Sequence, residues 1–219
     1  MNEFRRKIAA ESESKDWIAR WRTIARRIRV PLGFVAAAVY LWRLFEAAPQ
    51  PMAVAGSLLL VLPGLWLRGY AAGYVKKNQE LTQTGPYAYT RNPLYLGSML
   101  MAAGFAVTLM SVAFAAILLA GFVMIYVPVI AGEEEFLRNH FAAYEDYCRR
   151  VPRLLPRLLP RGQKTPWQVS HGVNAENANN EGGFSFALYR KHREYRAMLG
   201  ALLLYASLVA ARLLHMHRM

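Results

Sequence analysis

Cysteine is almost missing from this sequence. The single example, Cys148, excludes an internal disulfide bond and any zinc or iron–sulfur site built from several cysteines. Zinc-finger spacing and the aromatic strand pattern of RNA-binding modules are also missing, and the basic residues do not gather on one soluble face. We therefore expect no metal site and no nucleic-acid partner.

Charge is missing from the longest apolar run, residues 93–131, although the whole chain carries a formal net charge of +13. About 20 apolar residues cross a hydrocarbon core of about 30 Å, so this run has the length of two spans. It is predicted to form a helical hairpin with its tip at residues 108–111. Small residues such as Gly97 and Gly104 favour close helix contact.

Two more spans are predicted ahead of this hairpin, at residues 30–47 and 52–72, with the turn APQP between them. The hairpin helices are expected at about 93–108 and 112–131, and a helix outside the membrane at 133–150. A shorter apolar run follows at 198–211, and the sequence leaves open whether residues 198–214 cross the membrane. The expected fold is an all-α polytopic transmembrane bundle of four to five membrane helices.

Basic residues concentrate in three segments. Residues 1–29 hold nine Lys or Arg against four acids, with Trp17 and Trp21 one helical turn apart. This pattern is typical of an amphipathic helix on an anionic membrane surface, and a solvated, partly disordered leader is the alternative. Segments 1–29, 73–92 and 132–197 hold nearly all Lys and Arg, so the positive-inside rule places all three on the cytoplasmic side.

Two polar segments flank the uncharged hairpin, GPYAYTRNPLYLG at 85–97 and the stretch from 133 to 156. Because a hairpin returns to the side on which it started, we expect them to meet in one cytoplasm-facing pocket. The planar donors of Arg91, the Asn92 amide and a helix beginning at Pro93 suit a carboxylate. Acids at 133–135 suit an ammonium, and aromatic faces suit a sulfonium. The alternative is that these residues only anchor helices at the interface.

The motif order GPYxYxRNPxYxG, an apolar hairpin, EExxL and YxxYxxRVPRxLP resembles the superfamily of isoprenylcysteine carboxyl methyltransferases and phospholipid methyltransferases. The match covers roughly residues 50–160. The resemblance implies an integral membrane methyltransferase, expected in a bacterial inner membrane, that uses S-adenosylmethionine without a Rossmann domain. Consistently, no GxGxG turn follows a strand in this sequence.

The resemblance also implies which residues form the site. Cofactor-binding positions are Tyr87, Arg91, Asn92, Pro93, Tyr95, Gly97, Glu133, Glu134, Tyr147 and Pro152. Catalytic roles fall on Tyr89, Glu134 and Arg150. Asn92 stands where histidine is more usual, and an amide donates a hydrogen bond but does not titrate near neutral pH.

The chain continues beyond this match. Residues 161–183 read as a polar linker or lid, and 184–219 as a C-terminal amphipathic or membrane helix. Arg193, Glu194 and Tyr195 either close over the cofactor or form an amphipathic entry to that helix.

The function implied is methyl transfer to a lipid or prenylated acceptor that enters from the bilayer. Isoprenylcysteine-type carboxyl O-methylation is the first expectation, and N-methylation of phosphatidylethanolamine is the alternative. A carboxylate acceptor needs a cation such as Arg150, whereas an amine needs a base such as Glu133 or Glu134. A non-catalytic transport or accessory protein is the alternative from another class. The uncharged hairpin and the absence of buried acids within the membrane argue against an ion-coupled transporter.

Overall fold

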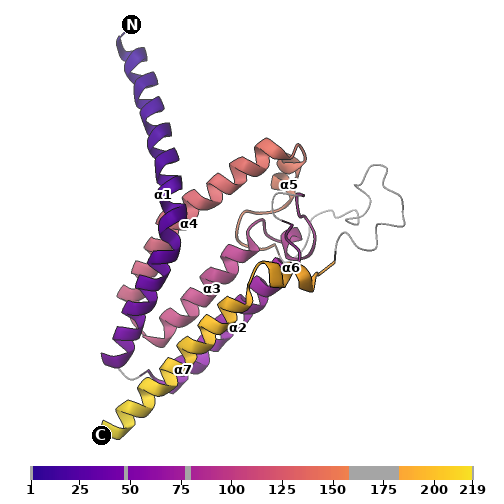
Figure 1. Ribbon diagram of the computed structural model, residues 1–219. Coiled ribbons are helices and arrows are strands. Elements are labelled where there is room, and N and C mark those ends of the chain that lie inside the picture. The colour runs from indigo at the N-terminus through magenta and orange to yellow at the C-terminus, as the bar shows by residue number, and fades with distance from the viewer. Residues whose placement is uncertain (1, 47–48, 77–79, 158–182, 219) are drawn as a thin grey trace.

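The computed structural model describes residues 2–46, 49–76, 80–157 and 183–218, and its regular structure within them is helical (Figure 1). The elements are α1 (Asn2–Glu46), α2 (Pro51–Ala72), the short 3-10 helix η1 (Gly85–Ala88), α3 (Pro93–Thr108), α4 (Val112–His140), α5 (Tyr144–Arg150), α6 (Phe186–Lys191) and α7 (Tyr195–Arg218). Apart from Gly183, the predicted linker at 161–183 lies outside the described residues.

The bundle has the composition of a membrane protein. Helices α2, α4 and α7 are each long and apolar enough to cross a membrane, and residues 30–44 and 93–108 form shorter apolar helices. Large apolar side chains on the outer faces are exposed, among them Phe34, Leu59, Ile117 and Leu203. Side chains of this kind are stable against lipid rather than water. The predicted all-α membrane bundle is confirmed.

The predicted hairpin is present, with its tip where the sequence placed it. Helix α3 ends at Thr108 and α4 begins at Val112, after Met110 adopts a positive φ of 46°. The Ser111 side chain caps α4 by accepting a hydrogen bond from the Phe114 amide at 3.3 Å. The polar residues of 108–111 therefore both end one helix and start the next.

Helices α2 and α3 pack most closely, and glycine permits the approach. A Cβ on Gly64 would lie 2.7 Å from the Gly97 carbonyl oxygen, and one on Gly97 would lie 2.7 Å from the Gly64 carbonyl oxygen. Pro51 and Pro93 occupy the first turns of these helices, where a missing amide hydrogen costs no helical bond. The close pair holds the start of α3 in a fixed position.

Helix α1 differs from the prediction of two segments divided at residue 30. It is one helix from Asn2 to Glu46 that passes through Pro31 and packs beside α4 (Figure 1). The predicted boundary marked a change of polarity, but residues 2–29 are rich in good helix formers and contain no glycine or proline. Polarity changes along α1 without interrupting its backbone.

Helix α4 also differs, because it continues eight residues past Gly132 to His140 before the chain turns into the short α5. A lone glycine does not stop a helix whose following residues are Glu, Phe and Leu. The break falls at Phe141, whose backbone is extended. The Glu133–Glu135 triplet is thus part of the long returning helix.

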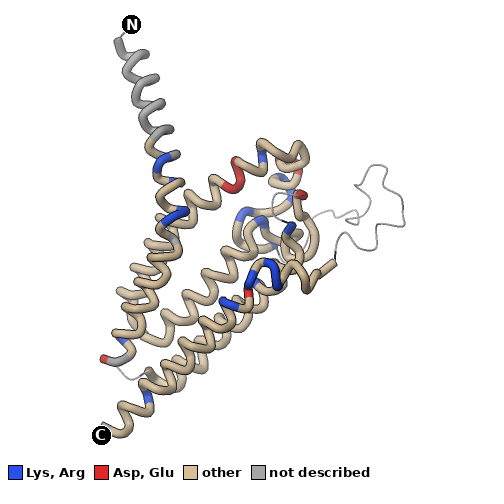
Figure 2. Tube along the Cα trace, in the orientation of Figure 1, with Lys and Arg blue, Asp and Glu red and all other residues tan. Residues whose placement is uncertain are grey.

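Helix α7 runs beside α2 and ends near the α1–α2 connection (Figure 1). Arg212 on α7 donates a hydrogen bond to the Pro49 carbonyl at 3.3 Å, and the hydroxyls of Ser57 and Tyr205 lie 2.8 Å apart. We call this the far end of the bundle, and the opposite end, where α5 and α6 lie, the pocket end. Most Lys and Arg of the described residues lie at the pocket end (Figure 2).

Candidate active site

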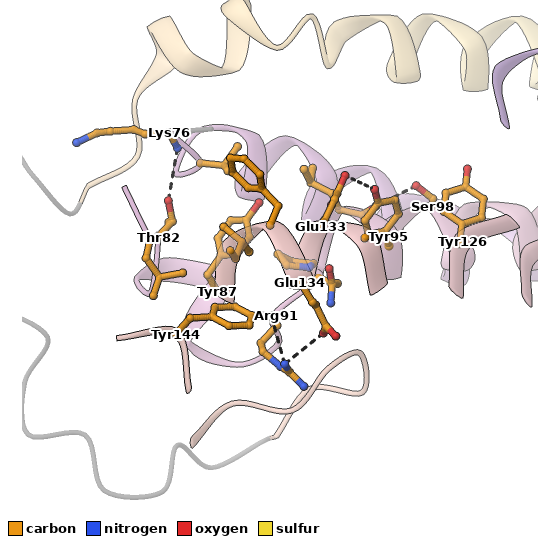
Figure 3. A pocket seen from close by; sticks show the side chains of 18 of the residues that line it. Lys76, Thr82, Tyr87, Arg91, Tyr95, Ser98, Tyr126, Glu133, Glu134 and Tyr144 are labelled. Atoms are coloured by element: carbon orange, nitrogen blue, oxygen red, sulfur yellow. Dashed lines mark hydrogen bonds and ion pairs between the residues drawn. The ribbon is translucent and has the colours of Figure 1, made fainter. Parts of the chain in front are cut away.

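A cavity of about 690 Å³ opens at the pocket end (Figure 3). Its walls come from α1, α2, η1, the first turns of α3, the second half of α4 and α5. The segments between α2 and η1 and just before α3 also contribute, as does Glu194 just ahead of α7. Its volume falls within the range of about 300–1,000 Å³ that is usual for small-molecule sites. The cavity therefore has the size of a small-molecule binding site.

The two polar segments expected to meet do lie together. The Arg91 amide donates to the Pro152 carbonyl at 2.9 Å, and the Asn92 side-chain amide donates to the Arg153 carbonyl at 2.8 Å. The Thr90 hydroxyl adds a hydrogen bond to the Leu154 carbonyl at 2.9 Å. These bonds satisfy backbone carbonyls of the segment after α5 and fix that segment against the start of α3.

Arg91 is at the centre of the polar wall. Its Nη1 lies 3.2 Å from Glu134 Oε1, 2.8 Å from Cys148 Sγ and 3.4 Å from the Tyr144 hydroxyl. Burial alone would lower the pKa of Arg91, but Glu134 and the Tyr144 hydroxyl outweigh burial and raise that pKa. The guanidinium therefore stays charged. Its buried Nε finds no acceptor among the described residues.

The two glutamates of α4 have different partners. Glu134 is 13% exposed and shared between two arginines, since Arg153 Nη2 also lies 2.8 Å from its Oε2. Glu133 accepts a hydrogen bond from the Tyr95 hydroxyl at 2.8 Å (Figure 3). Glu134 is thus neutralised by its neighbours, whereas Glu133 presents a carboxylate held by a neutral group.

Tyrosines form the apolar wall. Tyr87, Tyr144 and Tyr147 are buried, and the Tyr147 hydroxyl donates to the Tyr87 carbonyl at 2.7 Å. Burial raises the pKa of all three phenols well above their usual range. They remain neutral at physiological pH, so they offer ring faces and hydroxyls rather than charge.

Not every predicted site residue reaches the cavity. Eight line it: Tyr87, Arg91, Asn92, Pro93, Tyr95, Glu133, Glu134 and Tyr147. Gly97 instead packs against α2, and Pro152 contributes its carbonyl to Arg91. Tyr89 is 42% exposed, and exposed Arg150 donates to the Gln83 side chain at 3.0 Å. These last four lie outside the lining.

The cavity also contains residues that sequence reasoning did not place there. The main ones are Arg68 of α2, Ser98 of α3 and Tyr126 of α4. Arg68 had a detectable signal, because a charge inside an apolar span usually has a function. Ser98 and Tyr126 had none, since small polar and aromatic residues are common in membrane helices. Glu194 also lines the cavity, which agrees with the alternative in which Arg193, Glu194 and Tyr195 close over it.

The donor set fits a ligand with a carboxylate, an ammonium and a cationic sulfur. Arg91 offers charged donors, Glu133 offers an acceptor for an ammonium, and the tyrosine rings offer faces that attract a sulfonium. Among the described residues, no group of three or more His, Cys, Asp or Glu is placed to hold a metal ion.

Comparison with known proteins gives one family and two similar proteins. Residues 51–144 match the phospholipid methyltransferase family. A nickel-cobalt-cadmium resistance protein, NccN of Alcaligenes xylosoxydans xylosoxydans, is 35% identical over 121 residues, which is 55% of this chain and 56% of that protein. A cobalt-zinc-cadmium resistance protein, CzcN of Cupriavidus metallidurans, is 37% identical over 115 residues, 52% of each.

The matched region thus spans about half the length of these curated relatives. No solved structure matches the chain significantly. The family match includes the start of α3, the hairpin and Glu133–Glu134, and it ends at Tyr144. The segment after α5 and the residue Glu194 lie beyond it.

Proposed function

We propose that this protein, whose residues 51–144 match the phospholipid methyltransferase family, is a membrane enzyme that transfers a methyl group from S-adenosylmethionine to a lipophilic acceptor. The observation that carries the proposal is the ion pair between Arg91 and Glu134, whose side chains are 15% and 13% exposed and both line a cavity at the end of apolar, membrane-length helices. Exposed Arg153 holds Glu134 from outside the lining. The basic pocket end faces the cytoplasm by the positive-inside rule.

In this proposal the cofactor's amino-acid part lies between the first turn of α3 and the second half of α4. Arg91 binds its carboxylate, and Glu133 accepts from its ammonium while Tyr95 holds the Glu133 carboxylate in place. Asn92 supports the site indirectly, because its amide binds the Arg153 carbonyl. When bound, the cofactor supplies a methyl group on a positively charged sulfur. The neutral walls of Tyr87 and Tyr147 exclude water from that group.

The acceptor we propose is a lipid-borne carboxylate of the isoprenylcysteine type. Such a group arrives ionised and requires only a cation and in-line placement. The expected cation, Arg150, lies outside the cavity lining, and Arg68 on the membrane side of the cavity replaces it in the proposal. N-methylation of phosphatidylethanolamine is the second candidate. The phospholipid family match favours it, and Glu133 is the carboxylate best placed to accept the amine's proton.

The names of the two relatives suggest a role in resistance to nickel, cobalt, zinc or cadmium. In our proposal, such resistance would result from methylation of a membrane component and not from binding of the metal ions. A non-catalytic accessory protein is the competing explanation. It predicts no binding of S-adenosylmethionine, so one binding experiment separates the two.

The test is calorimetric titration of detergent-purified protein with S-adenosylmethionine. Wild type should bind, and Arg91→Ala should weaken binding by about 10- to 100-fold, because a hydrogen bond to a charged group contributes about 1.5–3 kcal/mol. Glu134→Ala should also weaken binding, because Glu134 holds the Arg91 guanidinium in position through their ion pair. Arg149→Ala is the matched control, since Arg149 is 81% exposed and lies outside the cavity lining. Absence of binding to wild type would refute the methyltransferase proposal.

The acceptor is identified by a separate measurement. Lipid extracts incubated with the protein and a deuterated-methyl cofactor are analysed by mass spectrometry. Labelled methyl ester in the product supports the carboxylate, and labelled phosphatidylethanolamine supports the amine. A protein that binds the cofactor but labels no lipophilic molecule would contradict both acceptors.

A further inference from the structure

Arg68 is a partly buried cation whose donors are divided between helix α3 and Glu194. It lies one turn before the end of α2, with its side chain 24% exposed. Nη1 points to α3, where it donates to the Ser98 hydroxyl and, at 3.4 Å, to the Leu94 carbonyl. The other edge, Nε and Nη2, faces Glu194. One edge thus fixes the guanidinium to the protein, and the second edge holds a single carboxylate.

The Glu194 carboxylate occupies that second edge in a bidentate manner. Arg68 Nε lies 3.0 Å from Oε2, and Nη2 lies 3.0 Å from Oε1 and 2.8 Å from Oε2. A planar guanidinium binds the carboxylate or phosphate of a ligand with the same two-point geometry. Both side chains line the cavity, and Glu194 is 12% exposed.

The backbone is bent to bring Glu194 to this position. Arg193, between α6 and α7, has a φ of 56°, which non-glycine residues rarely adopt. The segment before it is fixed at the end of α2, where the Ser185 amide donates to the Gly73 carbonyl at 2.8 Å and His192 Nε2 lies 3.0 Å from the Val75 carbonyl oxygen. Glu194 is therefore delivered from a separate, docked element, 126 residues away in sequence from Arg68.

We propose that Arg68 is the anion-binding group on the acceptor side of the cavity, and that Glu194 is an internal occupant which a lipid-borne carboxylate or phosphate displaces. The acceptor role rests on the function proposed above, whereas the anion site itself does not. Besides Arg91, the cavity lining contains the cations Arg26, Arg68 and Lys76. Lys76 pairs with Glu80 at the loop after α2, whereas Arg68 lies within the apolar helix α2 and already holds a carboxylate with two donors, so it is the cation best suited to a second anionic molecule entering from the membrane. Exchanging one anion for another keeps the partly buried Arg68 guanidinium paired with a carboxylate or phosphate, whereas departure of Glu194 alone would leave it without an anion.

The two members of this ion pair should respond in opposite directions. Glu194→Gln removes the competing anion and should tighten anion binding by about tenfold, whereas Arg68→Gln should weaken it by at least that factor. A pair that only holds the C-terminal segment in place predicts the same direction for both. Arg68→Lys keeps the positive charge but loses the two-point donor geometry of the guanidinium. Its affinity for the anion should therefore lie between those of wild type and Arg68→Gln.

The probes are radiolabelled dodecyl phosphate and dodecanoate, bound to protein in a neutral maltoside detergent without S-adenosylmethionine. Preference for one probe separates a phosphate from a carboxylate site, and dodecyltrimethylammonium is the control of opposite charge. Glu145→Gln and Arg149→Gln are matched controls outside the cavity lining. Opposite responses at Arg68 and Glu194 support the site, and equal affinities or parallel losses overturn it.

Failure of this inference differs from failure of the proposed function. Calorimetry with S-adenosylmethionine on the same preparations reports the cofactor site, and the amphiphile titration reports Arg68. If Arg68→Gln does not fold, the Glu194→Gln titration decides alone: an affinity no higher than that of wild type overturns the anion site.

Discussion

Asn92 shows how a residue inside a motif can also hold one wall of the cavity against another. It precedes α3 at the position of the N-cap, but its side chain makes no capping hydrogen bond. Its amide instead donates to the Arg153 carbonyl at 2.8 Å, and its side chain is largely buried. A neutral donor is sufficient for that task, and asparagine provides one without titrating near neutral pH.

Asn92→Ala should lower the free energy of unfolding by about 0.5–1.5 kcal/mol, because the Arg153 carbonyl loses its 2.8 Å hydrogen bond and keeps only the 3.5 Å one from the Thr90 hydroxyl. Thermal unfolding in detergent measures the loss. Asn139→Ala, an exposed change on α4, is the control and should leave the melting temperature unchanged. Equal melting temperatures for Asn92→Ala and wild type would contradict the assigned positioning role.

At the scale of elements, the α2–α3 pair determines the geometry of the site. The Arg68 side chain projects from α2 next to Gly97, since a Cβ on Gly97 would lie 2.7 Å from the Arg68 Cγ. The first turn of α3 carries Pro93 and Tyr95 into the cavity. A change in helix separation would therefore move both the Arg68 edge and the cofactor wall.

Gly64→Ala should destabilise the protein by about 1–3 kcal/mol, because its Cβ would overlap backbone atoms of α3. Gly56→Ala in the same helix has no atom within 4 Å of the new Cβ and should be neutral or stabilising, since alanine favours helix. Melting temperatures of the two variants, compared with wild type, provide the measurement. A loss of similar size in both would show that glycine is not needed for this approach.

Length and charge were sufficient to predict the hairpin, because an uncharged run of double length has few other folds in a membrane. They did not predict that α1 is continuous or that α4 continues past Gly132, since a change in polarity does not determine where a backbone bends. Within the site, local motifs predicted eight lining residues. They did not predict the pairing of Arg68 with Glu194, because no local pattern specifies a contact across 126 residues.

At the scale of the whole molecule, the distribution of charge and the path of the chain disagree about one helix. The pocket end carries most of the described Lys and Arg, which favours a cytoplasmic location for it (Figure 2). Helix α7 starts at that end and reaches the far end, so the sequence HMHRM would lie outside the cell. The far end of α7 carries only two arginines, Arg212 and Arg218, which is far fewer than the basic residues at the pocket end. The basic residues of the pocket end should therefore determine the orientation of the protein, and α7 should cross the membrane.

Single-cysteine labelling tests this path, because Cys148 is the only thiol to remove. In a Cys148→Ser background, cysteines replace Val112 and Met216 at the far end, which are 86% and 65% exposed, and exposed Asn139 at the pocket end. Sealed bacterial spheroplasts expressing each variant are treated with a membrane-impermeant maleimide. Val112→Cys and Met216→Cys should react in sealed spheroplasts, and Asn139→Cys only after lysis. If Met216→Cys reacts only after lysis, as expected for Asn139→Cys, α7 does not cross the membrane. Because α7 continues directly from Glu194, that result would also change the depth at which Glu194 meets Arg68.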